Sequence, residues 1–150
     1  MSKDGPGLTA VELDCLHSQL DLARAGQTEL LEESINVGLP VNLTASTGDS
    51  LLILAAYHRH PATVKMLLTR GADTERVNDH GQTALAAAVF RRDREIVGSL
   101  LAAGANPATG ERSALQVARF FNLTDMTELL TRLAPATAGP RDPAEGATTE

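Results

Sequence analysis

Apolar and polar positions along this chain follow a pattern that returns after 33 residues. Glycines, leucines and alanines coincide when the segment from Thr47 to Asn78 is aligned with the segment that begins at His80. The coinciding pairs are Gly48 and Gly81, Leu52 and Leu85, Ala55 and Ala88, Leu67 and Leu100, and Gly71 and Gly104. A repeat of this length is typical of a solenoid, in which each unit packs on its neighbours. The pattern therefore predicts a stack of similar helical units.

Two helices are expected in each unit, and residues that suit a helix N-terminus mark where they start. A short helix rich in alanine and leucine follows Ser50, Thr83 and Ser113, whose hydroxyl groups can accept a backbone N–H of the first turn. A capping box over Thr9–Glu12 predicts the start of a longer first helix. The apolar stripe of this first helix is Leu13, Leu16, Leu20 and Ala23.

The second helix of each unit is expected to end before a glycine. Gly38, Gly71 and Gly104 suit the left-handed residue that follows a helix C-terminus, and Pro61 suits the first turn of a second helix. Residues 73–81, which lead to the next unit, are rich in turn formers. These signals divide each unit into helix, turn, helix and loop.

The pattern Gly-x-Ser/Thr-x-Leu, a small-residue helix, a second helix that closes on Leu-Leu, and Gly-Ala-Asp/Asn resembles the ankyrin repeat. The resemblance covers Leu13 to Leu133 and implies an all-α solenoid of about four helix-turn-helix units with short β-hairpin loops. The family's usual Pro and His are replaced here, for example by Leu51 and Ile53. Stacking is therefore expected to depend on aliphatic packing more than on polar links between units, with modest stability.

The repeat domain is expected over residues 9–133, and the flanking segments 1–8 and 134–150 are predicted to be disordered. The predicted units are 13–45, 46–78, 79–108 and 109–133. The last unit follows a connection that is three residues shorter than the others. The first and last units are interpreted as caps, because end repeats must tolerate water.

Composition and charge narrow the class of partner. The 150 residues carry a net charge of −6, and the basic residues are scattered except in Arg91–Arg94, which we interpret as a solvated helix end. Nucleic acid is therefore not expected as a partner, because a phosphate-binding surface needs clustered positive charge. The longest apolar run, Leu51–Tyr57, is too short to span a bilayer, and the N-terminus lacks an apolar signal segment. We expect a cytoplasmic protein without membrane contacts, with the single Cys15 as a buried, inert thiol.

No group of residues has the spacing of a catalytic or metal site. In Gly104–Ser113 the gap between glycines is one residue too long for a phosphate loop, and Glu111 stands where that loop needs a lysine. His58 and His60 lack a third metal ligand at a recognisable spacing. We therefore expect no enzyme activity, no cofactor and no metal.

The family resemblance implies that a partner contacts the exposed ends of the first helices and the tips of the hairpins. At the helix ends these residues are Tyr57, His58, Phe90, Arg91, Phe120 and Phe121. At the hairpin tips they are Ser46, Thr47, Asp49, Asp79, His80 and Gln82. Tyr57, Phe90 and Phe120 are in register, and stacking of the units predicts that they form a ladder. Two interpretations of the ladder stay open, a partner site and packing between neighbouring units.

The expected function is binding without catalysis. A monomer would bind a partner protein, which the sequence does not identify, along the concave face and the hairpin tips. The alternative is a structural or self-associating assembly subunit that uses the same aromatic stripe. Both follow from the resemblance and from the residue types at the helix ends, since aromatics and arginine anchor protein interfaces.

Overall fold

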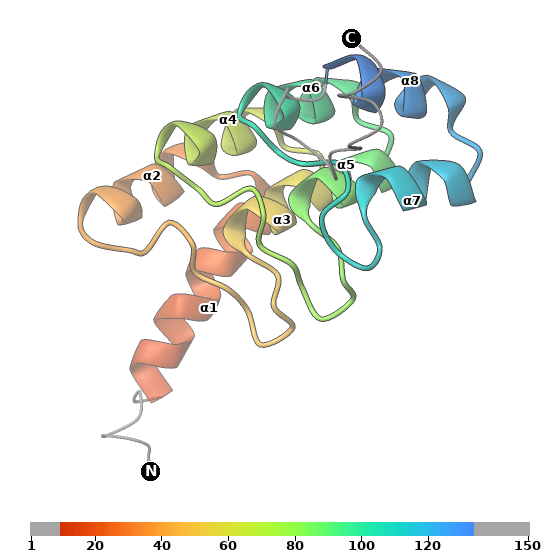
Figure 1. Ribbon diagram of the computed structural model, residues 1–150. Coiled ribbons are helices and arrows are strands. Elements are labelled where there is room, and N and C mark those ends of the chain that lie inside the picture. Colours follow the sequence, from red (N-terminus) through yellow and green to blue (C-terminus); the bar gives the residue numbers. More distant parts are fainter. Residues whose placement is uncertain (1–9, 134–150) are drawn as a thin grey trace, which may run out of the picture.

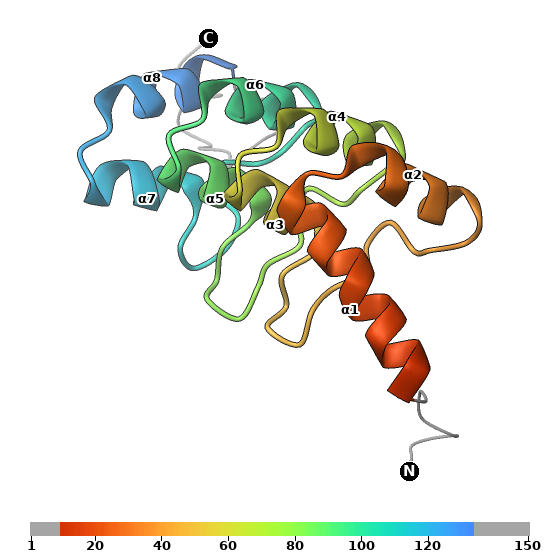
Figure 2. The ribbon, with the colours of Figure 1, turned by 180° about the vertical axis from the view of Figure 1, so that it is seen from behind.

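The computed structural model describes residues 10–133 of the chain, and these form eight helices in two layers (Figure 1). The inner layer holds α1 (Ala10–Ala25), α3 (Leu51–Tyr57), α5 (Ala84–Phe90) and α7 (Ala114–Phe120). The outer layer holds α2 (Thr28–Asn36), α4 (Pro61–Thr69), α6 (Arg94–Ala102) and α8 (Thr124–Leu133). Successive inner and outer pairs stack side by side, and three loops project from the stack on one side (Figures 1 and 2). The predicted all-α repeat solenoid is confirmed.

Side-chain caps hold the first turn of three inner helices. The hydroxyl groups of Ser50, Thr83 and Ser113 each accept the backbone N–H three residues further on, at 3.1, 3.2 and 3.3 Å. At α7 the Gln116 side chain also accepts the backbone N–H of Ser113, which completes a capping box. Pro61 occupies the first turn of α4. These predicted helix starts are confirmed. They could be predicted because a cap depends on one residue type at one position.

Two sets of turns at helix ends use a left-handed backbone, in addition to glycines within the loops. The predicted set follows the outer helices and consists of Gly38, Gly71 and Gly104, with φ of 121°, 88° and 96°. A second set joins the inner to the outer helix and consists of Gly26, Arg59, Arg92 and Asn122, with φ of 74°, 64°, 60° and 56°. Most members of this second set carry a Cβ, so the turn stores backbone strain in the later units.

The inner helices form the core of the stack. In α3 and α5 every residue except the last is buried. The equivalent residues Leu52 and Leu85 are fully enclosed, and alanines such as Ala55 and Ala88 let neighbouring inner helices approach closely. As a result α3 packs on α5, and α5 packs on α7. The aromatic residue that ends each of these helices is left at the surface.

The loops between units have the turns of the predicted hairpins without regular strands. Over residues 10–133 the one β-type pairing is an isolated bridge between Thr44 and Ser50. The backbone N–H of Asn78 donates to the Gln82 carbonyl at 3.0 Å, which closes one loop. Neighbouring loops are also linked, for example by a bond from the Arg112 N–H to the Gly81 carbonyl at 2.9 Å. The loops therefore stand in a row on one face of the stack.

Polar links between units accompany the aliphatic packing. Ion pairs between successive outer helices join Arg70 to Glu32, Lys65 to Glu95 and Arg94 to Asp125, at 2.8, 3.2 and 3.2 Å. Exposed pairs of this kind contribute about 0.2–1 kcal/mol each. The hydroxyl groups of Thr28 and the buried Thr63 also share a hydrogen bond of 2.7 Å between α2 and α4. The replacement of the family's usual histidine led us to expect few polar links between units, and the structure has more of them than expected.

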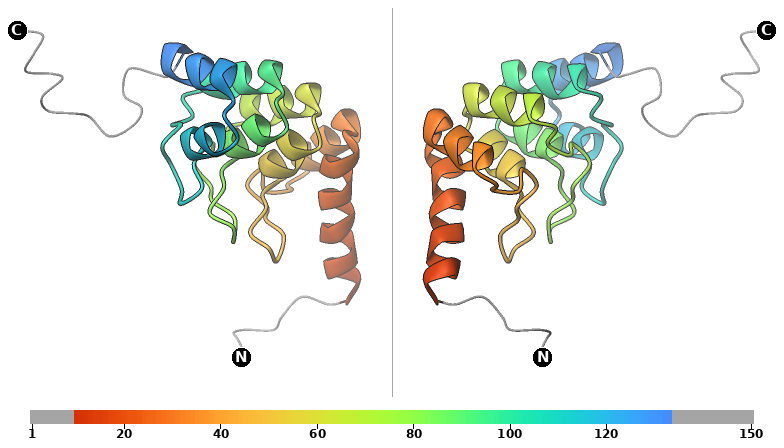
Figure 3. Two further views of the ribbon diagram at one scale, coloured as in Figure 1. Left: turned by 90° about the vertical axis from the view of Figure 1, so that its right-hand side faces the viewer. Right: turned by 90° about the vertical axis from the view of Figure 1, so that its left-hand side faces the viewer.

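The first helix differs from the other inner helices in length. It has 16 residues against seven in α3, and its N-terminal half extends past α3 on the loop side (Figures 2 and 3). Leu20 and Ala23 are buried in the stack, whereas Leu13 is exposed. Cys15 is exposed as well, so the prediction of a buried thiol is wrong. The reason is that α3 is too short to cover this part of α1.

Several predictions fall on residues outside the described part of the chain. These are the capping box that starts at Thr9 and the predicted disorder of residues 1–8 and 134–150. Between residues 10 and 133, no helix combines the length and the apolar content needed to cross a bilayer.

Candidate partner-binding groove

Four aromatic side chains lie in contact along the C-terminal ends of the inner helices. The rings of Tyr57 and Phe90 are stacked, with centroids 6.2 Å apart and planes that differ by 9°. Phe121 meets Phe90 edge-on at 5.6 Å, and Phe120 meets Phe121 edge-on at 4.9 Å. We call Tyr57, Phe90, Phe121 and Phe120 the aromatic ladder.

The order within the aromatic ladder differs from the predicted register. Phe120 is the sequence equivalent of Phe90, but the ring that lies against Phe90 is that of Phe121, the C-cap residue of α7. Among the described residues no further inner helix packs beyond α7, so Phe120 keeps 79% of its surface exposed. Tyr57, Phe90 and Phe121 are 39–43% exposed. The ladder therefore combines packing between units with a large accessible aromatic surface.

Polar side chains accompany the rings. The Arg91 guanidinium lies over the Tyr57 ring, 5.1 Å from its centroid, in a cation–π arrangement. The His58 ring meets Tyr57 edge-on at 5.2 Å. Both residues were predicted beside the ladder from their sequence positions, and the structure brings them to it.

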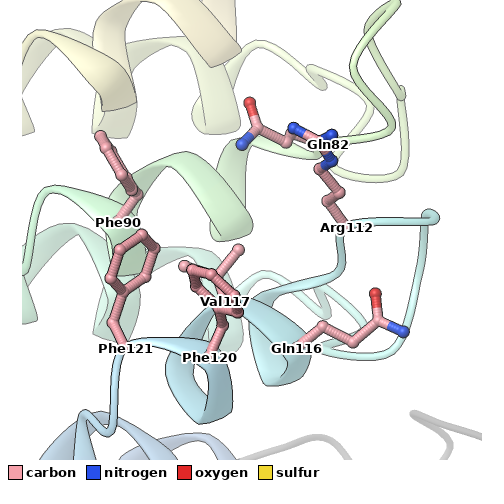
Figure 4. Close-up of a pocket in the computed structure, with 7 residues that line it drawn as sticks. All are labelled: Gln82, Phe90, Arg112, Gln116, Val117, Phe120 and Phe121. Atoms are coloured by element: carbon pink, nitrogen blue, oxygen red, sulfur yellow. The ribbon is translucent and has the colours of Figure 1, made fainter.

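Two adjoining hollows form one groove between the ladder and the loops, which we call the concave groove. The larger hollow is about 580 Å³ and runs from α1 to α5, and the smaller is about 440 Å³ and lies between α5 and α7 (Figure 4). Predicted partner residues that line one or both hollows are Thr47, Asp49, Tyr57, His58, His80, Gln82, Phe90, Phe120 and Phe121. Ser46 and Asp79 are exposed on the loops without lining a hollow, and Arg91 lies over Tyr57 instead.

Sequence reasoning missed several residues of the concave groove. Arg24 lines the larger hollow at the end of α1, and it lies 33 residues before Tyr57, so the repeat register could have identified it. Arg112 lines both hollows from the loop before α7. Gln116 and Val117 line the smaller hollow from α7 itself. No local pattern in the sequence marks these last three residues as part of a site.

The concave groove has positive character in an acidic protein. Burial, followed by the charges of His60, Arg24 and Arg91, holds the pKa of His58 below its usual value, and Asp49 acts in the opposite direction. His58 therefore presents a neutral imidazole at neutral pH. The fixed positive charge of the groove comes from its arginines.

His60 has a structural place that separates it from His58. Its Nε2 atom is 2.7 Å from the Arg24 carbonyl oxygen, and a Cβ added at Gly26 would meet its ring. It also stands at the N-cap of α4. Within residues 10–133 no three His, Cys, Asp or Glu side chains are grouped in a way that could hold a metal ion.

One sequence family covers most of this solenoid. A family model described as ankyrin repeats, in three copies, matches residues 20–111. The chain belongs to the ankyrin repeat family. Ankyrin repeats generally serve as protein–protein interaction modules and are typically not catalytic. In this ankyrin repeat protein the matched segment contains Tyr57 and Phe90 and ends just before Arg112.

Relatives from bacteria and an animal share the repeat region. A Pseudomonas aeruginosa protein named as an ankyrin repeat protein is 44% identical over 61 residues, which are 41% of this chain and 36% of the relative. A Treponema pallidum protein named as ankyrin repeat-containing is 36% identical over 103 residues, 66% of this chain and 35% of the relative. A Caenorhabditis elegans homologue of a transient receptor potential cation channel is 34% identical over 127 residues, 81% of this chain and 10% of the channel. The chain thus matches about a third of the length of each bacterial relative.

Proposed function

We propose that this ankyrin repeat protein is a non-catalytic module that binds a partner protein along the concave groove and the loop tips. The aromatic ladder is the observation that supports this most directly. Its rings are accessible, contiguous and flanked by arginines, and these residue types dominate the energetics of protein interfaces. The proposal includes the cytoplasmic location and the monomeric state expected from the sequence.

The exposure of Phe120 distinguishes between a binding role and a packing role for the aromatic ladder. A ring whose only task is to fill the space between units should be largely covered by them. Phe120 touches Phe121 yet is 79% exposed, so the stack recovers little apolar burial from it. An accessible phenylalanine beside a hollow lined by Phe90 and Val117 is better explained by a partner that covers it.

The proposal is tested by partner capture from native extract with the parent chain and a Phe120→Ala variant. Because Phe120 is so exposed, we expect the free energy of unfolding of the variant to lie within about 0.5 kcal/mol of that of the parent. Loss of this accessible aromatic anchor should weaken partner binding about tenfold, measured by calorimetry on the captured protein.

A matched control is Leu133→Ala, which removes another exposed large apolar residue, at the end of α8 and away from the groove. It should bind like the parent. Partners that are captured equally by the parent and the Phe120→Ala variant would contradict the proposal and move the binding surface elsewhere.

Self-association is the second candidate function, and one observation favours it. The outer side of the first unit has a hollow of about 410 Å³ whose lining includes the exposed Leu30 and Val37. Among the described residues, the buried Oε1 atom of Gln19 in the same hollow has no hydrogen-bond partner. Sedimentation velocity over a range of concentrations distinguishes the two candidates. A mass that stays that of a monomer at all concentrations would rule out self-association. A dimer that dissociates in the Val37→Asp variant would establish it.

A further inference from the structure

The smaller hollow of the concave groove has two chemically different sides. Figure 4 shows Phe90, Phe120 and Phe121 on one side and Gln82 and Arg112 on the other. The first side suits a large apolar group, because the rings offer broad, rigid surface at low conformational cost. The second side consists of polar side chains that face the same space.

The polar side of this hollow is rich in hydrogen-bond donors. The Oε1 atom of Gln116 is already used, since it accepts the backbone N–H of Ser113 at 3.2 Å in the capping box. The NH₂ group of Gln116 therefore remains to donate. The Arg112 guanidinium can only donate. A ligand group that pairs with Arg112 must accept hydrogen bonds, and a carboxylate forms the strongest such bonds with a guanidinium.

Charge in the rest of the concave groove points in the same direction. Between residues 10 and 133 no ion pair joins Arg91 or Arg112 to a carboxylate, whereas Arg24 pairs with Asp21. Asp49 is the acid that lines the groove, and its two oxygens accept bonds from Thr47 and from Asn78. Each oxygen of Asp49 thus has one hydrogen-bond partner within the protein.

Acids near the groove lie at its margin. Asp79 and Glu111 are exposed on the loops and line neither hollow. Two arginines, Arg24 and Arg112, line the groove against one acid, Asp49, in a chain whose net charge is −6. Such a contrast attracts acidic partners and disfavours basic ones.

We infer that the concave groove takes an acidic segment of a partner polypeptide in which a carboxylate lies next to a large apolar side chain. The apolar side chain packs on Phe90, Phe120 and Phe121, and the carboxylate accepts hydrogen bonds from Arg112. This inference rests on the proposed function and specifies the chemistry of the partner. Residues 134–150 of this chain are not the occupant, because they contain no aromatic, leucine, isoleucine, valine or methionine residue.

A displayed library of random twelve-residue peptides, selected on the full chain, tests the inference. The enriched peptides should carry Asp or Glu within about two residues of Leu, Ile, Phe, Tyr or Trp. A synthetic peptide with the enriched sequence should bind Arg112→Glu about tenfold more weakly than the parent. Arg132→Glu is the matched control, because it changes the net charge equally at an exposed site on α8, and it should bind like the parent.

The outcomes separate this inference from the proposed function. The inference of an acidic partner would be overturned if the enriched peptides need Phe120 but are neutral or basic. It would also be overturned if they bind Arg112→Glu as well as the parent. In both cases the groove would remain the proposed binding site. The same holds if a single-stranded oligonucleotide displaces the peptide at equal concentration, because the groove would then respond to charge alone. If selection yields no peptide that depends on Phe120, both the inference and the proposed function fail.

Discussion

Strain in single residues is concentrated at the turn between the inner and outer helices. Gly26 and Arg92 occupy equivalent positions with φ of 74° and 60°, but only at Gly26 would an added methyl group meet the His60 ring. We predict that Gly26→Ala lowers the free energy of unfolding by about 1–2 kcal/mol, because alanine resists a left-handed backbone and displaces the imidazole. Arg92→Gly should instead leave the free energy of unfolding unchanged or slightly raised, since relief of backbone strain offsets the extra conformational entropy that glycine gives the unfolded chain. Urea unfolding followed by circular dichroism measures both, and the reverse ranking would contradict this assignment of strain.

Helix α6 is capped by Asp93, the residue before its first turn. Asp93 accepts the backbone N–H of Ile96 at 3.1 Å and lies 3.6 Å from the Arg59 guanidinium of the preceding unit. We predict that Asp93→Ala lowers the free energy of unfolding by about 1 kcal/mol, because the first turn loses its acceptor. Asp93→Asn keeps an acceptor and removes the charge, so it should retain most of the stability. If Asn is as harmful as Ala in thermal melts, the ion pair with Arg59 matters more than the cap.

The whole molecule is stabilised chiefly by apolar contacts between neighbouring inner helices, with the outer ion pairs as a minor contribution. Leu85 in α5 is completely buried, whereas Lys65 and Glu95 form an exposed pair at 3.2 Å. We predict that Leu85→Ala lowers the free energy of unfolding by about 2–5 kcal/mol, because it leaves a cavity between units. Lys65→Glu should lower it by about 1 kcal/mol or less. Denaturant titrations at low and at high salt give both values, and a charge reversal as harmful as the core truncation would show that ion pairs dominate the stack.

Much of this architecture could be predicted because it is encoded at single positions and in their spacing. Ser50, Thr83 and Ser113 cap helices as expected, since a cap needs only a hydroxyl group one residue before the helix. Errors arose where the outcome depends on which element covers a residue. Cys15 has the apolar spacing of a buried residue but is exposed, in the half of α1 that extends past α3 (Figure 2).

The candidate site was predictable only in part, for the same reason. Tyr57 and Phe90 stack as their register predicts, because they are equivalent positions in adjacent units that share the full 33-residue period. Arg112 lies on a loop whose period is shortened by three residues, so no register relates it to the earlier units. Its place beside Gln82 and across the hollow from Phe90 follows from how the loops pack in three dimensions.

The sequence by itself determined the solenoid, the starts of α3, α4, α5 and α7, and the side of the molecule on which the aromatic residues gather. These features depend on a period of 33 residues and on local hydrogen bonds, both of which can be read along the chain. Only the tertiary structure decided that Phe121 lies against Phe90, that Phe120 stays exposed and that Arg112 forms the opposite side of the hollow. The physical reason is that neighbours across units are selected by packing distances and by where the stack ends, and neither is specified by the pattern within one repeat.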